Sequence, residues 1–363
     1  MKNIHTITFH HVLNYGAVLQ AYALAKFLKQ EGYEVEVLDY RPSYFMFQTY
    51  RPAKGLLKTI NKAKKNIRFY KFRRDFLPLS KNTFFSVFKL KKKFANSNDY
   101  FICGSDQVWN ANLTKDKIDK GYFLDFLPKK AIKISYAASM GNTGFDANHT
   151  EAKEVLSSFH KILVREDFAQ NEINKISNNT IDSSIVVDPT LLLNNYNEIL
   201  DFSLVPNEPY LVSYLTENSK EVKEYIRKVV KMTGLPLINL GHHYIEDAQK
   251  NYLYESPSKW LGVFSKATMV CTNSFHGNAY SLIFKRNFTV FSRSTKKELN
   301  RRQLTLLENL GLEHRFIYKI DDLKEEHLKD IDYNKVNPKY DTLVNKSKKL
   351  LIDAIENLDS KEV

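Results

Sequence analysis

One local pattern recurs along the whole chain. A short apolar run rich in β-branched residues stops at small or polar residues, and a helical spacing of apolar residues follows. The first example has an apolar run at 4–9, a turn at 10–16 and a helical spacing at 17–30, and a second apolar run begins at 35–38. Strand, helix and strand in this order form a βαβ unit, the building block of parallel sheets covered by helices. The sequence therefore predicts an α/β fold.

The pattern occurs in two series, which predicts two domains. A polar stretch that ends in Asn207-Glu208-Pro209 separates the series and suits a crossing between domains. The chain has 363 residues, of which 43% are hydrophobic and 13% aromatic, enough for two cores. We expect an N-terminal Rossmann-like domain at 1–195 with an insertion at 41–95, a C-terminal Rossmann-like domain at 196–335, and an amphipathic helix within 336–363 that packs back across both domains.

The positive charge is concentrated in one segment. The net charge is +13, and residues 51–93 hold 15 Lys or Arg and a single acid, Asp75, so the rest of the chain is close to neutral. Aromatic residues are interleaved with these cations: Phe69, Tyr70, Phe72, Phe76, Phe84, Phe85 and Phe88. The mixture suits an anionic membrane surface or a phosphate-rich ligand, and a solvated basic face is the alternative. No base-reading motif is present, so we predict no nucleic-acid partner.

Composition and motifs exclude several classes of protein. Two cysteines, Cys103 and Cys271, argue against a disulfide scaffold or a cysteine metal site. Residues 1–20 lack the pattern of a secretory signal, and no window approaches 18 uninterrupted apolar residues, so we expect a cytoplasmic protein, with peripheral contact at the inner face of the membrane left open. The side chains of the adjacent residues His242 and His243 would point in different directions, and no acidic cluster lies near them in the sequence, so we predict no metal site there. The turn at Gly16 lacks the G-x-G-x-x-G spacing, so we predict no nicotinamide cofactor, and no other cofactor is expected.

Polar residues follow the apolar runs of the first series. The carboxyl ends of parallel strands meet at one edge of a sheet, where doubly wound folds bind their ligands. The candidates to line such a cleft are Asn14, Gly16, Ser105, Asp106, Gln107, Trp109 and Ser139. The alternatives are that Asp106 caps a helix, that Trp109 belongs to the core, and that Gly16 permits tight packing. Arg165 follows a buried run and needs an anion, although a neighbouring carboxylate would serve.

The stretch at 267–285 is the strongest candidate for a site in the second series. It has an apolar run, the polar turn Thr272 to Gly277, and a helical spacing. His276 lies where the turn becomes the helix, and the free N–H groups of a helix start attract anions. A histidine at this point is suited to proton transfer beside an acidic ligand. The alternative is that His276 only caps the helix or packs under the turn.

Several motifs together resemble those of one family. They are N-Y-G-A-V-L-Q-A-Y-A-L at 14–24, G-S-D-Q-V-W-N at 104–110, S-Y-A-A-S-M-G at 135–141, V-R-E at 164–166, D-P-T-L-L-L at 188–193, S-P-S-K-W-L at 256–261 and T-N-S-F-H-G at 272–277. In number and order they resemble the polysaccharide pyruvyl transferase family. The resemblance implies two Rossmann-like domains in a GT-B-like arrangement, phosphoenolpyruvate as the co-substrate, and a sugar hydroxyl pair as the acceptor.

The resemblance also implies roles for residues. His276 matches the general acid, and Gly277 and Asn278 follow it at the start of the helix. Arg165 matches one of the arginines that hold the donor. The second arginine of the family commonly lies two residues before the histidine, where this chain has Ser274. Two residues are candidates to replace its charge, first Arg302 and then Arg293.

Two other functions remain open at this point. A GT-B-like glycosyltransferase would use a nucleotide sugar, because helix starts with arginine and histidine suit a diphosphate equally well. The third possibility is a non-catalytic glycan-assembly protein on the same fold. In that case the usual arginine is absent at Ser274 because the activity has been lost. The leading prediction is a pyruvyl transferase that forms a ketal on a surface polysaccharide or its lipid-linked precursor.

Overall fold

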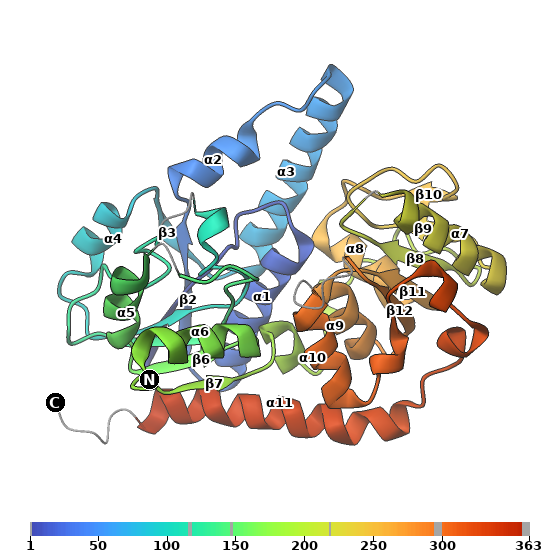
Figure 1. Cartoon of the computed structure of the whole chain (residues 1–363). Helices are drawn as coiled ribbons and strands as arrows, with labels where there is room; N and C mark the ends of the chain where they lie inside the picture. The colour runs from blue at the N-terminus through green and yellow to red at the C-terminus, as the bar shows by residue number, and fades with distance from the viewer. Residues whose placement is uncertain (1, 115–117, 146–147, 218, 294–299, 358–363) are drawn as a thin grey trace. The chain divides into compact units, whose positions relative to one another are not determined.

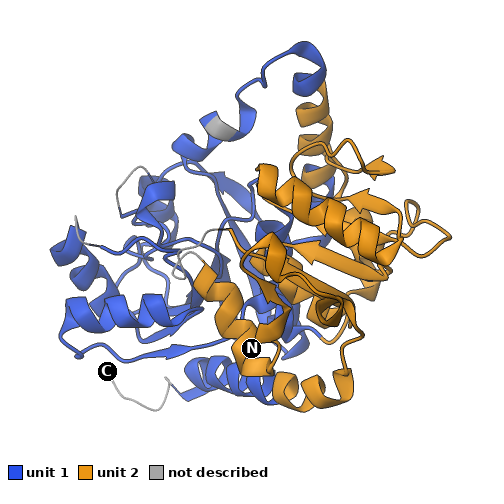
Figure 2. Ribbon diagram, turned by 45° about the vertical axis from the view of Figure 1, so that its right-hand side comes forward, with its two compact units in different colours: residues 1–59, 70–193, 342–363 blue, residues 60–69, 194–341 orange. Residues whose placement is uncertain are grey.

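A computed structural model describes residues 2–114, 118–145, 148–217, 219–293 and 300–357. The chain divides into two compact units (Figures 1 and 2). Unit 1 contains residues 1–59, 70–193 and 342–363, and unit 2 contains residues 60–69 and 194–341. The division falls at 193/194, against 195/196 in the sequence-based expectation, and two helices contribute residues to both units.

Unit 1 is built on a parallel sheet that has seven strands among the described residues, in the order β3-β2-β1-β4-β5-β6-β7. Its strands are β1 (Asn3–Ile7), β2 (Glu34–Tyr40), β3 (Leu79–Phe84), β4 (Tyr100–Cys103), β5 (Ile132–Ala138), β6 (Lys161–Val164) and β7 (Ser183–Ile185). The helices that lie wholly in it are α1 (Tyr15–Gln30), α2 (Ser43–Tyr50), α4 (Val87–Phe94), α5 (His149–Ser157) and α6 (Asp167–Ser177). This is the predicted doubly wound topology.

The strand order places the expected ligand edge at the ends of β1 and β4. The chain builds the sheet outward in one direction through β1, β2 and β3, and then continues on the other side of β1 with β4. Ligands of such sheets bind outside the carboxyl ends at this reversal. Asn14 caps α1 there by accepting a hydrogen bond of 3.2 Å from the Ala17 N–H. Nearly every side chain of α1 is buried, which fixes the helix against the sheet.

Unit 2 has a second parallel sheet, with the order β10-β9-β8-β11-β12-β13 among its described residues. Its strands are β8 (Leu211–Tyr214), β9 (Leu237–Asn239), β10 (Lys250–Asn251), β11 (Met269–Thr272), β12 (Asn287–Phe291) and β13 (Phe316–Ile317). Its helices are α7 (Lys220–Thr233), α8 (Pro257–Ser265), α9 (Phe275–Ile283) and α10 (Arg301–Leu310). The two sheets confirm the predicted α/β class with two Rossmann-like halves.

Helices α3 (Leu56–Phe76) and α11 (Tyr333–Glu356) have residues in both units. The first part of α11 is fixed in unit 2 by the Tyr333 hydroxyl, which donates to the carbonyl of Arg286 at 2.7 Å. Its later part is fixed in unit 1 by Ser347, whose hydroxyl accepts from the Val187 N–H at 3.0 Å. The predicted C-terminal amphipathic helix is therefore present, and it begins earlier than its apolar spacing indicated. None of the described helices has both the length and the apolar character to cross a bilayer.

Candidate functional site

The turn between β11 and α9 holds His276 in the first turn of a helix. Thr272 ends β11, and its hydroxyl donates to the Tyr214 carbonyl at 2.7 Å and accepts from the Ser274 N–H at 3.0 Å. Ser274 is the N-cap residue, in an extended conformation and without a side-chain cap bond. A Cβ on Gly277 would lie 2.0 Å from the Thr272 hydroxyl oxygen, so only glycine fits there. These contacts hold the helix start tightly against the strand end.

His276 is inside α9 rather than at its cap. Its side chain is buried, with 8% of the residue exposed, and its ring contacts the Phe275 ring edge-on at 5.5 Å between centroids. Because Ser274 occupies the N-cap position, the alternative that His276 caps the helix is wrong. Packing under the turn remains compatible with this burial. The position also satisfies the requirement for a histidine beside an anion held at a helix start.

A hydrogen-bond network joins the His276 turn to the start of α10. The side-chain oxygen of Asn273 accepts from the Thr216 N–H at 2.8 Å. The Gln303 side chain donates to the Asn273 backbone carbonyl, also at 2.8 Å. Arg302 precedes Gln303 in the first turn of α10 and is half-buried. The network therefore brings the helix that carries Arg302 onto the turn that carries His276.

Arg293 follows β12 at the same edge of the sheet. Its backbone N–H donates to the Asn300 side chain at 3.0 Å, and its Nε donates to Glu217 at 2.8 Å. Both members of this ion pair are about one-third exposed. The charge of Arg293 thus has a carboxylate partner at the surface. Both arginines stay predictions for the charge that is absent at Ser274.

Asn278 lies one helical position beyond Gly277 and is fully buried. Neither its amide nitrogen nor its amide oxygen has a hydrogen-bond partner among the described residues. A buried amide without partners costs free energy unless water or a ligand satisfies it. Its predicted place at the donor site stays a prediction that this geometry supports.

In unit 1, Arg165 is buried in an ion-pair network at the ends of β6 and β7. Its Nη1 donates to Asp188 at 2.9 Å, and its Nε lies 3.5 Å from the Glu166 carboxylate. The Ser105 hydroxyl donates to the same Asp188 oxygen at 2.8 Å. Burial would lower the pKa of Arg165, but the charges of Asp188 and Glu166 raise it overall. The carboxylates of Asp188 and Glu166 are therefore the anions that Arg165 needs, as the alternative reading of the sequence proposed. That Arg165 binds phosphoenolpyruvate stays a prediction.

The loop after β4 is held by polar contacts with the end of β5. Asp106 has a φ of 71°, and its carbonyl accepts from the Ser139 N–H at 3.0 Å. The Asp106 carboxylate accepts from the Gln107 N–H at 2.9 Å, so this side chain caps its own turn. Gln107 in turn accepts from the Asn110 side chain at 2.7 Å. Ser139 is fully buried and accepts from the Gly141 N–H at 3.1 Å. These residues give the loop one fixed conformation.

Two candidates of unit 1 have structural roles. Trp109 is 1% exposed, stacks on Phe123 with ring centroids 5.1 Å apart, and donates to the Tyr122 carbonyl at 3.1 Å. The expectation that Trp109 lines a cleft is therefore wrong, because its ring is core and its one donor is used. Gly16 is buried in the first turn of α1, in agreement with the tight-packing alternative.

Sequence reasoning missed the residues that hold the His276 turn, namely Thr272, Asn273 and Gln303. Thr272 and Asn273 are in the T-N-S-F-H-G motif, in which the sequence predicts site residues only at Ser274, His276 and Gly277. Gln303 lies 30 residues later, and nothing in its own segment marks it. The described residues contain no cluster of three or more His, Cys, Asp or Glu side chains that could hold a metal ion.

Solved structures similar to this chain have the GT-B fold. MnaA from S. aureus, in a structure with UDP, has 10% sequence identity and a TM-score of 0.53, and the match covers 100% of this chain and 99% of that one. A putative UDP-N-acetylglucosamine 2-epimerase from Listeria monocytogenes has 9% identity and a TM-score of 0.52, covering 99% and 97% of the two chains. At such identities the likeness shows the fold alone.

Sequence comparison identifies the family. No curated protein matches the chain. The model of the family described as polysaccharide pyruvyl transferase matches residues 14–295, most of the chain, and includes the turn of His276 and the loop after β4. The chain belongs to the polysaccharide pyruvyl transferase family.

Proposed function

We propose that the protein transfers the enolpyruvyl group of phosphoenolpyruvate to a pair of sugar hydroxyls and forms a pyruvate ketal. The observation that carries the proposal is the bond from Gln303 to Asn273, which holds the start of α10 on the turn of His276. In the proposal His276 is the proton donor, and Arg302 at the adjoining helix start supplies a cation; the bond supports this assignment by joining the two elements in unit 2. Transfer from an anionic enol ester such as phosphoenolpyruvate requires a proton donor for its methylene carbon and cations for its carboxylate and phosphate.

The reaction balances with His276 as the acid. Protonated His276 gives its proton to the methylene carbon of phosphoenolpyruvate, which becomes a methyl group, and the neighbouring carbon becomes electrophilic. One sugar hydroxyl attacks this carbon, the carbon–oxygen bond to phosphate breaks, and the second hydroxyl closes the ketal. Of the two hydroxyl protons, one returns to His276 and the other leaves with phosphate.

The cations of the site would hold the donor's carboxylate and phosphate. We assign this role first to Arg302, with the N–H groups of Gly277 and Asn278 at the start of α9 adding partial positive charge. Arg165 is the second donor ligand in the family pattern, and in this role it would have to bind through the edge of a guanidinium already paired with Asp188.

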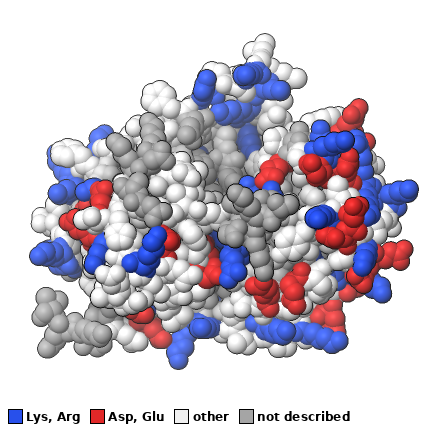
Figure 3. Space-filling view, viewed as in Figure 1, with Lys and Arg blue, Asp and Glu red and all other residues white. Residues whose placement is uncertain are grey.

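The acceptor is proposed to be a saccharide linked to a lipid carrier, and residues 51–93 to contact the membrane. Basic side chains gather over the tip where α3 begins, at the top of Figure 3, with no acidic atom beside them on this face. Large apolar side chains are exposed in this segment and just before it: Phe47, Tyr50, Leu56, Leu57, Ile60, Ile67, Tyr70, Phe85 and Phe88. Of the interleaved aromatic residues, Phe69, Phe72 and Phe84 are buried and are unavailable to a membrane. Exposed apolar residues among cations support peripheral binding to an anionic bilayer.

Liposome flotation tests the membrane contact. We expect the protein to float with vesicles that contain anionic lipid and to be released by salt, because the attraction is screened within about 8–10 Å at 0.1–0.15 M ionic strength. A matched variant replaces Leu56 and Leu57 with Ser and should bind less at every salt concentration. Equal recovery with neutral and anionic vesicles would remove the membrane contact from the proposal.

The fold of the UDP-bound neighbour makes a nucleotide-sugar transferase the second candidate. Thermal-shift titration separates the two, because a ligand that binds only the folded state raises its stability. Stabilisation by phosphoenolpyruvate and not by UDP favours pyruvyl transfer, and the reverse result favours the second candidate. The decisive assay incubates the protein with phosphoenolpyruvate and lipid-linked saccharides and follows phosphate release together with the mass of the ketal. Stabilisation by neither ligand would point to a non-catalytic protein of the same fold.

A further inference from the structure

A largely buried cluster of arginine, histidine and aspartate side chains lies at the ends of β1 and β2 in unit 1. Its members are His10, His11, Asp39, Arg41 and Arg73. The first two follow β1, the next two lie at the end of β2 and just after it, and Arg73 comes from the last turn of α3. None of them has a part in the proposed pyruvyl transfer.

Asp39 is the carboxylate of the cluster, and its oxygens are already occupied. One oxygen accepts from His10 Nε2 at 2.9 Å and from Arg41 Nε at 2.6 Å. The other accepts from the Thr83 hydroxyl at 2.6 Å. Asp39 therefore pairs with Arg41, and none of the hydrogen bonds of the described residues joins it to Arg73.

Arg73 is a buried cation that makes no ion pair within 4 Å of a carboxylate in the part of the chain that the structure describes, although the charge of Asp39 is close enough to act on it. Only 3% of the residue is exposed. Its Nη1 donates to the carbonyl of His11 at 3.4 Å, and its Nε has no acceptor among the described residues. Burial lowers the pKa of Arg73 to about 10, and the charge of Arg41 adds to the effect, so the side chain is still a cation at pH 7. A buried charge without a partner is costly, and proteins keep one where an opposite charge arrives.

His11 presents a second group without a partner. The residue is 3% exposed, and neither ring nitrogen has a hydrogen-bond partner among the described residues. Burial, and after it the charges of His10 and Arg73, lower the pKa of His11 well below its ordinary value. A neutral imidazole carries one N–H and can donate it to an anion. Because the ring is uncharged, it needs no carboxylate partner while the anion is absent.

We propose that Arg73 and His11 form an oxyanion-binding site for a phosphate or diphosphate group. The start of α1 follows the same loop, and its first turn has no acidic residue that would compete for the free N–H groups. These donors suit phosphate, because a guanidinium can bind it through two parallel hydrogen bonds. The imidazole N–H and the N–H groups of the helix start can donate to its other oxygens. The assignment of this group to the acceptor rests on the proposed function, whereas the site itself does not.

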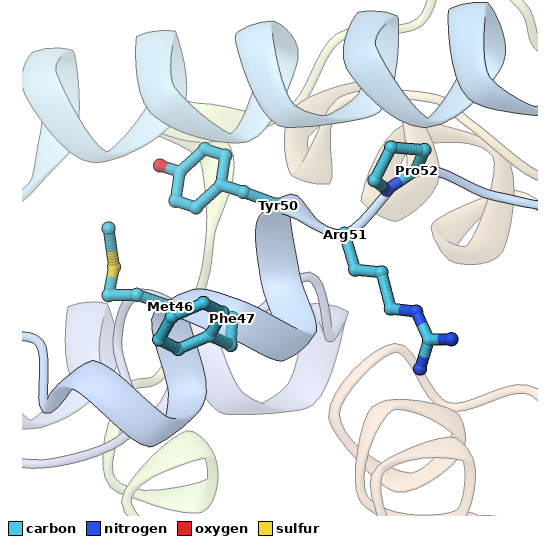
Figure 4. A pocket seen from close by; sticks show the side chains of 5 residues that line it. All are labelled: Met46, Phe47, Tyr50, Arg51 and Pro52. Atoms are coloured by element: carbon cyan, nitrogen blue, oxygen red, sulfur yellow. The ribbon is translucent and has the colours of Figure 1, made fainter.

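Helix α2 connects this cluster with an apolar pocket. Phe45 packs on the His11 ring, with centroids 5.5 Å apart. On the same helix and just after it, Met46, Phe47, Tyr50, Arg51 and Pro52 line a pocket of about 750 Å³ (Figure 4). A diphosphate attached to a hydrocarbon chain would find donors for its head and apolar side chains for its tail within this part of unit 1.

Calorimetric titration with inorganic pyrophosphate tests the site. We expect Arg73→Met to weaken pyrophosphate binding at least about tenfold, because it removes charge-assisted hydrogen bonds. Arg74→Met is the matched control, since Arg74 is the next residue of α3, is exposed and pairs with Asp75. It removes the same charge and should change the affinity by less than about twofold. Equal affinities of the wild type and Arg73→Met, or no binding to the wild type, would overturn the proposal.

Stability gives an independent measurement. Without ligand, Arg73→Met should unfold at the same temperature as the wild type or above it, and pyrophosphate should raise the melting temperature of Arg74→Met but not of Arg73→Met. If Arg73→Met does not fold, His11→Phe keeps the ring packed on Phe45, loses the donor, and should still weaken binding severalfold. A folded His11→Phe variant with wild-type affinity would then count against the site.

Two further ligands complete the test. Farnesyl diphosphate distinguishes a lipid carrier from a free phosphate, and phosphoenolpyruvate distinguishes failure of the proposed function from failure of the oxyanion site. If the oxyanion belongs to a lipid carrier, farnesyl diphosphate should bind more tightly than pyrophosphate, and Phe47→Ser should remove the gain. Equal binding of both would assign the site to a phosphate without a lipid chain. Phosphoenolpyruvate binding should be the same in Arg73→Met as in the wild type. If the wild type does not bind phosphoenolpyruvate, the proposed function fails, but the result with pyrophosphate still stands.

Discussion

The side chain of Gln303 donates a 2.8 Å hydrogen bond to the backbone carbonyl of Asn273 and thereby fixes the start of α10 on the turn before His276. Gln303 is 3% exposed and Asn273 is fully buried, so water does not compete for this bond. The bond links an element that carries a candidate cation to an element that carries a candidate acid. Its role is to position both.

Gln303→Leu should therefore impair donor binding without removing a reacting group. The lost bond leaves a buried carbonyl unsatisfied and should cost about 1–3 kcal/mol of unfolding free energy. We expect the KM for phosphoenolpyruvate to rise more than kcat falls, as steady-state phosphate release would show. Gln170→Leu is the control, because Gln170 makes an equivalent bond to the Ser183 carbonyl in unit 1. A KM that changes equally in both variants would mean that only stability was affected.

His276→Ala should strongly slow turnover in a folded protein. Loss of a general acid commonly lowers the rate about 10²- to 10⁴-fold. We expect kcat for ketal formation to fall within this range, with circular dichroism unchanged. His243→Ala removes an exposed histidine of the same unit and should leave the rate as it was. Near-normal transfer by folded His276→Ala would contradict the acid role.

Arg302→Ala and Arg293→Ala should differ in their effect on donor affinity. Arg302 is the proposed ligand, and its loss should raise the KM for phosphoenolpyruvate at least about tenfold. Arg293 is held by Glu217 in an exposed ion pair, a contact worth about 0–1 kcal/mol, so its variant should remain close to the wild type. The reverse ranking would transfer the donor role to Arg293.

The pair of Arg165 and Asp188 distinguishes a structural from a substrate-binding arginine. Asp188→Asn leaves the Arg165 charge buried with a weaker set of partners and should destabilise the protein by about 3–5 kcal/mol in urea unfolding. Replacing both residues, Arg165→Met with Asp188→Leu, should recover much of the loss. If the double variant also binds phosphoenolpyruvate normally in a thermal-shift titration, Arg165 is not a donor ligand.

The sequence was sufficient for the architecture because each strand and helix carries its own pattern. The helical spacing at 17–30 is α1, which ends at the predicted residue, and α9 begins within the predicted turn. Partners that are distant in the sequence were not predictable in this way. Arg165 and Asp188 meet because β6 and β7 are neighbours in the sheet, and Gln303 reaches Asn273 only once α10 has packed.

Local pattern also failed where burial decides the role of a residue. Trp109 lies in a polar loop motif, and only the packing of Phe123 against it shows that the ring is core. Arg73 looked like one of fifteen cations in a basic segment, whereas the fold buries it beside His11. The sequence pattern places a residue on an element, but the tertiary contacts decide what that residue does.

Acid should weaken the fold through Asp39. Burial alone would raise the pKa of this carboxyl, but the hydrogen bonds and charges of His10 and Arg41, with the Thr83 hydroxyl, lower it overall. A carboxyl with a depressed folded-state pKa stabilises the protein above its unfolded-state pKa of about 3.9, and this contribution is lost as the pH falls below that value. The unfolding free energy from urea titrations should therefore drop between about pH 5 and pH 3. Asp39→Asn should be less stable at pH 7 and show a shallower drop over the same interval, and an equal slope in both proteins would assign the acid sensitivity to other carboxylates.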